Sequence, residues 1–214
     1  MFLMRVRLPD RPGSLGAVAT AMGTVGGDIN AVEIVEKGED LASGEEFAVD
    51  DFIVDLPAGK LPETIVTACH LLPGVRVEWI SRYPEGGGLQ SDLEALERMT
   101  ADPGHAAETL VTLAPVVFRS QWAVLVQVRG DDIETVFSTT LAPTFSEETL
   151  RRFAPYDVAH RVDLEDGWIP GWADSTVVVT PLTQDRVIAI GRLGGPHFLD
   201  SEIARLHHLA ALVK

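Results

Sequence analysis

The sequence has little cysteine and few basic residues. Cys69 is the only cysteine among 214 residues, which excludes an internal disulfide and a cysteine-rich metal site. Its place in an apolar helical run beside Ala68 and Leu72 predicts a buried, unreactive thiol. Lys and Arg number 17 against 32 Asp and Glu, for a formal net charge of −15. Nucleic acid and anionic membranes are therefore not expected as partners, because both would be repelled.

Long hydrophobic runs are also missing. No uninterrupted apolar stretch approaches the roughly 20 residues that a helix needs to span a bilayer. The apolar residues at the N-terminus reach Pro9 and Asp10 before the apolar core of a signal peptide is complete. We therefore expect a cytoplasmic protein with no membrane partner.

Common catalytic and nucleotide-binding motifs are absent from the sequence. There is no Gly-x-Ser-x-Gly elbow, and Gly59-Lys60-Leu61 lacks the remaining residues of a phosphate-binding loop. The glycine-rich segment from Gly191 to Pro196 has the wrong spacing for a nucleotide fingerprint and is predicted to be a turn. We therefore expect no enzyme activity and no cofactor.

Histidine and carboxylate pairs lack metal-binding or catalytic spacing. His207 and His208 are adjacent, so on a helix they point about 100° apart and cannot chelate one ion. Asp50 and Asp51 lie on a predicted strand, where neighbours face opposite sides. They are predicted to be solvated side chains beside a turn or an edge, not an acid and base pair. No metal site and no catalytic residue is expected.

The first 84 residues alternate between strand and helix patterns. Their order of strand, helix, strand, strand, helix, strand predicts an α+β, ferredoxin-like βαββαβ sandwich with two helices on one sheet face. The other face and the edges are left open, which favours a homodimer or an internal partner. Strands are expected over residues 2–8, 29–35, 47–56 and 75–83, helices over 14–25 and 61–72, and a long polar loop over 37–44.

The segment around the first turn predicts a small-ligand docking site. Pro12 fixes φ and Gly13 has no Cβ, so a ligand can approach the backbone N–H groups where the following helix starts. Asp10-Arg11-Pro12-Gly13-Ser14-Leu15, followed by Gly27-Asp28-Ile29-Asn30, resembles the signature of ACT domains, which sense amino acids. The resemblance covers residues 1–84.

This resemblance implies that a free amino acid or similar effector is held near the first loop, often between two such domains. Asp10 departs from the amide that amino-acid-binding members often carry, and its carboxylate would favour the α-ammonium group. A purely structural interpretation is also open: a simple Pro-Gly turn, a helix cap at Asp10 and a strand-entry residue at Asn30. The expected ligand-binding residues are Asp10, Arg11, Pro12, Gly13, Ser14, Leu15 and Asn30.

Residues 85–88 are predicted to link this domain to a second one over residues 89–214, because Pro and Gly separate a finished strand from a new helix. The second domain is expected to be α/β, with an antiparallel sheet flanked by helices. A capping box at Ser91 is expected to begin its first helix. Further helices are expected over 105–114, 146–153 and 198–213, strands over 122–128, 133–141, 177–179 and 187–190, and irregular chain over 155–174.

This half resembles a GAF-type sensory domain. The resemblance depends on paired helices before Trp122, a strand ending at Gly191-Arg192, and Phe198-Leu199-Asp200-Ser201-Glu202 leading into a final helix. The cyclic-nucleotide signature of that family is not seen. The resemblance implies a domain used for dimerisation or for relaying a bound state.

An aromatic segment in this half has two interpretations. Trp168 and Trp172, with Tyr156, Asp157 and His160 nearby in sequence, could line a second, apolar pocket. Alternatively, the aromatic rings pin the loop to its own core.

Three functions follow from these patterns. The first is a non-catalytic regulatory protein that binds an amino acid in its first domain and relays the bound state through its second. The second is a ligand-free dimeric scaffold for a partner enzyme or regulator. The third is an enzyme pocket covered by the segment from Trp168 to Trp172, which would need converging carboxylates or His160 in a cleft.

Overall fold

A computed structural model describes residues 1–83, 88–164, 167 and 175–213. The chain divides into two compact units, residues 1–85 and 86–214, called unit 1 and unit 2. Each unit has its own hydrophobic clusters, and no residue is shared between the clusters of the two units. In the described parts of the chain, no helix is both long and apolar enough to cross a bilayer.

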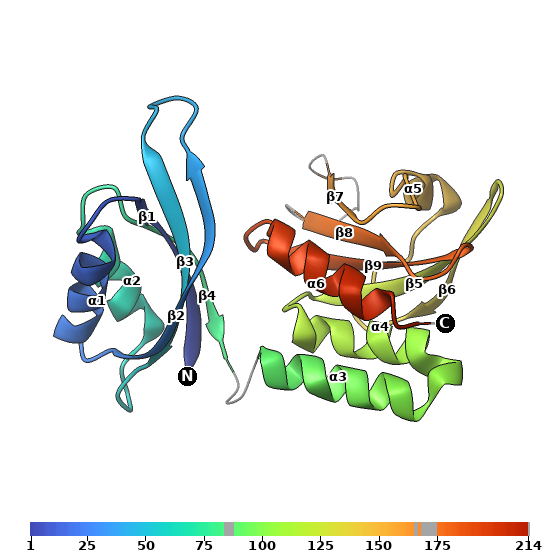
Figure 1. Ribbon diagram of the computed structural model, residues 1–214, viewed down its shortest axis with the longest axis horizontal. Helices are drawn as coiled ribbons and strands as arrows, with labels where there is room; N and C mark the ends of the chain where they lie inside the picture. The colour runs from blue at the N-terminus through green and yellow to red at the C-terminus, as the bar shows by residue number, and fades with distance from the viewer. Residues whose placement is uncertain (84–87, 165–166, 168–174, 214) are drawn as a thin grey trace. The chain divides into compact units, whose positions relative to one another are not determined.

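Unit 1 is a four-stranded antiparallel sheet with two helices on one face (Figure 1). The strand order is β2-β3-β1-β4, so each helix connects two strands that have a third strand between them. Met4 and Val6 of β1 face the helices and pack with Val18 and Phe52. The predicted order of elements is present: β1 (Phe2–Pro9), α1 (Ser14–Thr24), β2 (Asp28–Glu39), β3 (Glu46–Asp55), α2 (Pro62–His70) and β4 (Arg76–Arg82).

The end of β2 differs from the prediction of a loop over residues 37–44. The strand continues to Glu39, because Gly38 pairs with Phe47 of β3 and the aromatic ring lies across the glycine. A Cβ at Gly38 would be 2.7 Å from the tip of the Phe47 ring. The guanidinium of Arg7 lies 3.6 Å from the ring centroid and also contacts Asp40 at 3.0 Å. These contacts extend the ordered hairpin beyond the polar sequence pattern.

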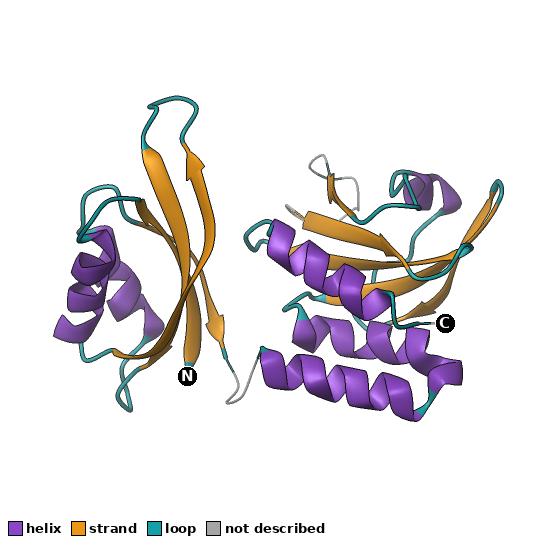
Figure 2. Ribbon diagram, viewed as in Figure 1, coloured by secondary structure: helices purple, strands orange, loops and turns teal. Residues whose placement is uncertain are grey.

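Unit 2 is a five-stranded antiparallel sheet with helices on both faces (Figure 2). The strand order is β6-β5-β9-β8-β7. One cluster packs α3, α4 and α6 with one face, and a second packs α5 with the other. The elements are α3 (Leu89–Ala101), the 3-10 turn η1 (Pro103–His105), α4 (Ala106–Val117), β5 (Trp122–Arg129), β6 (Asp132–Ser138), α5 (Glu147–Arg151), β7 (His160–Asp163), β8 (Ser175–Pro181), β9 (Arg186–Leu193) and α6 (Asp200–Ala210).

Three local predictions for unit 2 were wrong. The first helix begins at Leu89 after Gly88, so Ser91 lies within its first turn and does not cap it. Helix α4 continues past Pro115, because Val117 and the following Phe118 are buried in the core cluster and packing outweighs the proline. Strand β7 forms inside the stretch expected to be irregular, where it pairs with β8.

Gly191 lies within β9, in agreement with the predicted strand that ends at Gly191-Arg192, so the turn predicted for residues 191–196 starts too early. It pairs with Trp122 of β5, and a Cβ there would be 2.0 Å from the indole ring. The ring of Trp122 also contacts Phe145, with 5.2 Å between centroids. This position therefore requires glycine because the indole occupies the space of a side chain.

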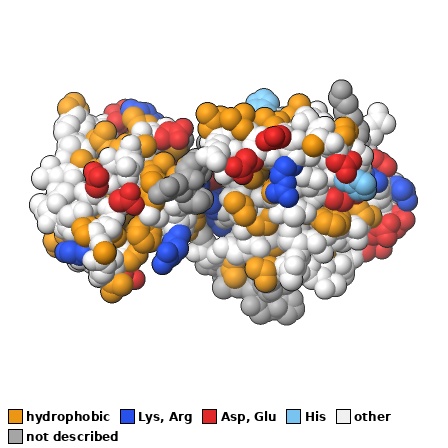
Figure 3. All heavy atoms as spheres, turned by 90° about the horizontal axis from the view of Figure 1, so that it is seen from below, with side chains coloured by type: hydrophobic (Ala, Val, Ile, Leu, Met, Phe, Trp, Pro, Cys, Tyr) orange, Lys and Arg blue, Asp and Glu red, His pale blue; other side chains and the backbone are white. Residues whose placement is uncertain are grey.

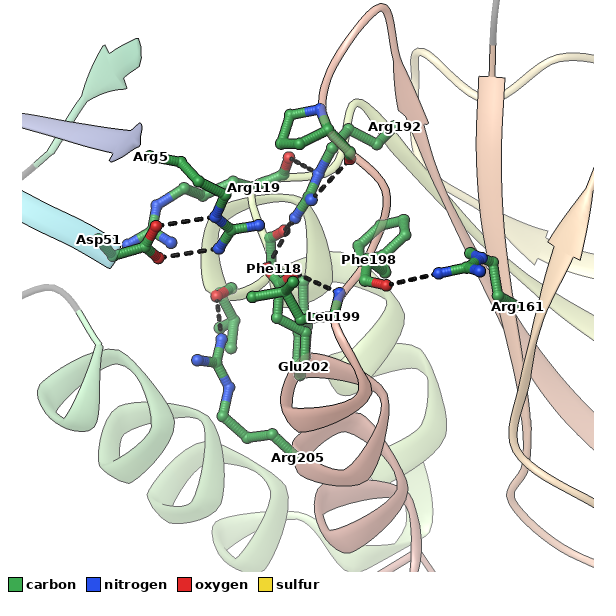
Figure 4. A network of polar contacts seen from close by, with 12 residues as sticks. Arg5, Asp51, Phe118, Arg119, Arg161, Arg192, Phe198, Leu199, Glu202 and Arg205 are labelled. Atoms are coloured by element: carbon green, nitrogen blue, oxygen red, sulfur yellow. Dashed lines mark hydrogen bonds and ion pairs between the residues drawn. The ribbon is translucent and has the colours of Figure 1, made fainter. Parts of the chain in front are cut away.

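A buried arginine connects the end of β9 to two helices of unit 2 (Figure 4). Arg192 is 1% exposed and donates hydrogen bonds to the carboxylate of Glu202 at 2.9 Å and to the carbonyl of Phe118 at 2.8 Å. Its guanidinium lies 4.0 Å from the ring centroid of Phe198. Glu202 in turn accepts a bond from the backbone N–H of Leu199 at the start of α6. The charge is thus compensated, and the network holds α6 against α4 and β9.

Candidate functional site

The turn after β1 places the start of α1 within reach of a ligand. Gly13 has a φ of +94°, a left-handed conformation that favours glycine. The N–H of Ser14 donates to the carbonyl of Arg11 at 3.2 Å, and the N–H of Ala17 donates to the carbonyl of Gly13 at 2.9 Å. In the described chain no acceptor is found for the N–H groups of Leu15 and Gly16. Two donors at the positive end of the helix are therefore available.

A hollow of about 310 Å³ lies beside this turn. One wall is formed by the turn and the start of α1, with Pro9, Arg11, Pro12, Gly13, Ser14 and Ala17. The opposite wall is the segment that follows α2, with Leu72, Pro73 and Val75. Four of the predicted site residues line the hollow together: Arg11, Pro12, Gly13 and Ser14.

The hollow lies between two helix ends of opposite polarity. Helix α1 begins at Ser14 on one side, and α2 ends at His70, two residues before Leu72 on the other side. The N-terminus of a helix carries a partial positive charge and the C-terminus a partial negative charge. Arg11 adds a full positive charge on the α1 side. A zwitterion that places its anionic group at α1 and its cationic group towards α2 is complementary to this arrangement.

Asp10 does not cap α1, and it does not line the hollow. Its carboxylate accepts a hydrogen bond from the ammonium of Lys37 at 2.8 Å. That hydrogen bond and the charge of Asp10 raise the pKa of Lys37. The carboxylate expected to hold a ligand ammonium is therefore engaged by a lysine of β2.

Asn30 lies at the other end of the sheet from the turn. Its side-chain amide donates to the carboxylate of Asp55 at 3.2 Å, whereas the backbone N–H of Asp10 donates to the carbonyl of Glu46. Glu46 and Asp55 are the two ends of β3, about 30 Å apart at the rise of an extended strand. One amino acid cannot contact both Asp10 and Asn30 of the same chain, so the predicted set does not form a single intrachain site.

Leu15, also a predicted site residue, does not line the hollow, and its side chain is exposed. The sequence reasoning missed the opposite wall of the hollow, from Leu72 to Val75. The signal was available in the Pro73-Gly74 turn. In the predicted fold the first strand–helix loop and the second helix–strand loop lie at the same end of the sheet.

The two adjacent carboxylates of β3 are buried, contrary to the prediction that they are solvated. Both oxygens of Asp51 accept from Arg5, at 2.8 Å each, on the sheet face without helices in unit 1. Asp50 shares the helix-covered face with Val6, with which it pairs in register. Its Oδ1 has no donor within the described chain, and burial, then the charge of Asp10, raises its pKa. The two face opposite sides as predicted and do not form an acid and base pair.

The only cysteine is buried as predicted. Cys69 lies in α2 with no exposed surface, and burial raises the pKa of its thiol to about 11. The thiol is therefore neutral and unreactive at physiological pH. Within residues 1–83, 88–164, 167 and 175–213, no three His, Cys, Asp or Glu side chains are placed to hold a metal ion.

The predicted second pocket is described only in part. Trp168 and Trp172 lie outside the described residues. The hydroxyl of Tyr156 donates to the carbonyl of Leu150 at 3.0 Å, and its side chain packs against the α5 side of the sheet. His160 lies in β7, with 3.0 Å between its Nδ1 and the carbonyl oxygen of Val158. Tyr156 lines a hollow in unit 2, and His160 does not.

No protein-family model and no curated protein matches the chain. Among solved structures, the GAF domain of a protein described as a sensor histidine kinase from Pseudomonas syringae pv. tomato is similar at 16% identity, with a TM-score of 0.41 over 58% of this chain and 82% of that one. An unknown protein from Galdieria sulphuraria is similar at 12% identity, with a TM-score of 0.29 over 97% of this chain and 89% of that one. Because both TM-scores are below 0.5, neither structure indicates a function for this chain.

Proposed function

We propose that this is a non-catalytic regulatory protein that binds a free amino acid in the hollow of unit 1. This proposal is supported by the two helix ends on opposite sides of the hollow. The N-terminus of α1 lies on one side and the C-terminus of α2 on the other. The α-carboxylate would face Arg11 and the positive N-terminus of α1, and the α-ammonium group would lie towards the end of α2. The ACT-like motif from Asp10 to Leu15 agrees with this ligand class.

Regulation would operate by a population shift. An amino acid that binds one arrangement of a homodimer better than another stabilises that arrangement. In this proposal unit 2 is a GAF-like domain that reads the arrangement through the glycine-rich linker. No catalytic residue, metal or cofactor is needed.

Thermal unfolding against single free amino acids tests the proposal directly. A ligand at one hundred times its dissociation constant adds about 2.7 kcal/mol to the stability of the part that binds it. We expect one amino acid, or a few related ones, to raise the midpoint of unit 1. If none does at millimolar concentration, the protein is instead a ligand-free scaffold, and the search turns to a protein partner.

Filling the hollow gives a matched pair of variants. Ala17 lines the hollow, so Ala17→Met is expected to abolish the ligand-dependent shift while leaving the helix intact. Thr20→Met adds a similar side chain one turn further along α1, at an exposed position outside the hollow, and should leave the shift unchanged. Equal effects of the two variants would contradict this location.

Removing the positive charge at α1 gives a second pair. Arg11→Ala should weaken binding about tenfold, which is the usual cost of one lost charge-assisted hydrogen bond. Arg82→Ala removes an exposed arginine from β4, at the opposite end of the sheet, and should have no effect. Asn30→Ala should likewise leave the affinity unchanged.

A further inference from the structure

Unit 2 contains a larger hollow, of about 620 Å³, whose lining includes Tyr156 and Asp157 from the predicted second pocket. Three segments form it: Tyr156 and Asp157 before β7, the turn between β8 and β9, and the end of α6 at His207 and Ala211. We propose that this hollow binds a small organic cation with an aromatic or apolar body. The site belongs to a different unit from the amino-acid site and does not depend on it.

Hydrogen bonds fix the walls of this hollow in the absence of a ligand. The Tyr156 hydroxyl is held on the carbonyl of Leu150, and Thr183 donates to the carboxylate of Asp185 at 2.8 Å. The N–H of Leu182 donates to the carbonyl of Arg186 at 2.9 Å, which closes the turn between β8 and β9. A preformed hollow lowers the entropy that binding must overcome.

The charged groups around the hollow determine whether a positive or a negative ligand is favoured. Asp157 contributes a carboxylate, and no Lys or Arg is among the described residues that line the hollow. Helix α6 ends at Ala210, so its partially negative C-terminus lies at the wall formed by His207 and Ala211. A positive group is therefore favoured, and an anion is disfavoured.

Apolar and uncharged polar groups complete the site. Pro181, Leu182 and the ring of Tyr156 offer apolar contact, and the Tyr156 ring can also face a cation. The side-chain amide of Gln184 adds hydrogen-bonding capacity. On His207, Nδ1 lies 3.3 Å from the hydroxyl of Thr180, so Nε2 is the nitrogen left for a ligand. These groups fit the ammonium and the ring of an arylalkylamine.

Phenethylamine is a suitable probe, because it carries an ammonium group and a ring but has no carboxylate for α1. Phenylacetate supplies the same ring with the opposite charge. We would titrate each into the full-length, ¹⁵N-labelled protein and follow backbone amide resonances. The expected result is a saturable shift with phenethylamine at Leu182, Thr183, Gln184 and Ala211, and none with phenylacetate.

Two variants with controls locate the contact. Asp157→Asn should weaken phenethylamine binding about tenfold, the range for a hydrogen bond to a charged group, whereas Asp132→Asn on β6 should not. Ala211→Phe should fill the hollow and abolish the shifts, whereas Ala204→Phe on the exposed side of α6 should leave them. These substitutions change exposed residues, so the fold is retained.

Several results would overturn the proposal. One is the absence of any saturable shift at millimolar phenethylamine, and another is equal binding of phenylacetate. Shifts at residues 13–17 in place of the turn between β8 and β9 would also refute it. An amino acid that binds unit 1 while phenethylamine fails would leave the proposed function standing and remove only this site.

Discussion

At the scale of single residues, Asp50 and Asp51 show how strongly the two faces of a strand can differ. Asp51 is paired with Arg5 through two hydrogen bonds, whereas Oδ1 of Asp50 has no donor in the described chain. A buried carboxylate oxygen without a donor opposes folding, whereas a buried carboxylate paired with an arginine is favourable, and neutralising it weakens that pair. Replacing each carboxylate by its amide should therefore change stability in opposite directions.

We predict that Asp50→Asn stabilises unit 1 by about 1 kcal/mol at pH 7. The pKa of Asp50 is raised in the folded protein, so the folded state holds the proton more tightly than the unfolded state. The stabilisation from this tighter proton binding is complete at pH values below the pKa of Asp50 in the unfolded chain, near 3.8. It is lost as the pH rises through the pKa of Asp50 in the folded protein. The gain from Asp50→Asn should disappear towards pH 3.8, which denaturant unfolding over a pH series measures.

Asp51→Asn is the companion variant, with an expected loss of about 3 kcal/mol at pH 7 because it breaks a buried ion pair. The two substitutions are isosteric and adjacent, so each is a control for the other. Equal effects of the same sign would contradict the different environments assigned to the two carboxylates.

Gly191→Ala should be severely destabilising. The added Cβ would lie 2.0 Å from the Trp122 indole, so the buried ring or the strand pair must move, at a cost of about 3 kcal/mol. Gly104→Ala is the control in the same unit, because its Cβ would meet nothing closer than 3.6 Å. Chemical denaturation of both variants checks the prediction, and similar midpoints would contradict it.

At the scale of elements, the far end of the β2–β3 hairpin depends on one aromatic ring. Phe47 lies across Gly38 and beneath the guanidinium of Arg7. We predict that Phe47→Ala frays this end, so that amide hydrogens of residues 37–39 exchange faster while those of β1 near Met4 keep their protection. Val32→Ala, an exposed change in the middle of β2, should not alter exchange at residues 37–39. Uniform acceleration in both variants would argue against a local role for the ring.

Local sequence patterns predicted most element types and fewer of their ends. Alternation and helical periodicity predicted the βαββαβ order of unit 1, although β2 has no buried residue and β3 is buried on both faces. Pro115 suggested a helix end, but burial of Val117 and Phe118 continues the helix. Strand β7 has only four residues, too few for a periodic signal, and it is defined by pairing with a strand that follows it in sequence.

The candidate site was predictable only where one continuous segment forms it. Arg11 to Ser14 were identified from the turn chemistry, whereas the wall from Leu72 to Val75 comes from a loop about 60 residues away. Asn30 was included through a family resemblance, and the register of β3 places it at the opposite end of the sheet. The burial of Asp50 likewise depends on what packs above the strand, which alternation alone does not indicate.

At the scale of the whole molecule, the two units should unfold separately. The clusters of unit 1 and unit 2 share no residue, so each has its own cooperative core. We predict two calorimetric transitions, of which Asp51→Asn lowers one and Gly191→Ala lowers the other. A single transition that both variants lower equally would show that the units unfold as one. An amino acid that binds unit 1 should raise only the transition that Asp51→Asn lowers.

The protein carries nearly twice as many acidic as basic side chains, 32 against 17. Figure 3 shows acidic side chains spread over the visible face of both units, in keeping with the formal net charge of −15. Such a surface favours solubility and raises the local concentration of small cations. The overall negative charge adds to the preference of the unit 2 hollow for a positive ligand. Added salt should weaken this long-range attraction.

The opposed helix ends beside the Gly13 turn also bear on stereochemistry. An amino acid held by its carboxylate at α1 and its ammonium at α2 has two of the four substituents of its α-carbon fixed. The wall of Ala17 and Val75 then decides whether the hydrogen or the side chain of the ligand meets the protein. Only one of two mirror-image ligands can place its carboxylate at α1, its ammonium at α2 and its hydrogen against the wall at the same time. In the proposed mode of binding, the hollow would discriminate between the two enantiomers of an amino acid.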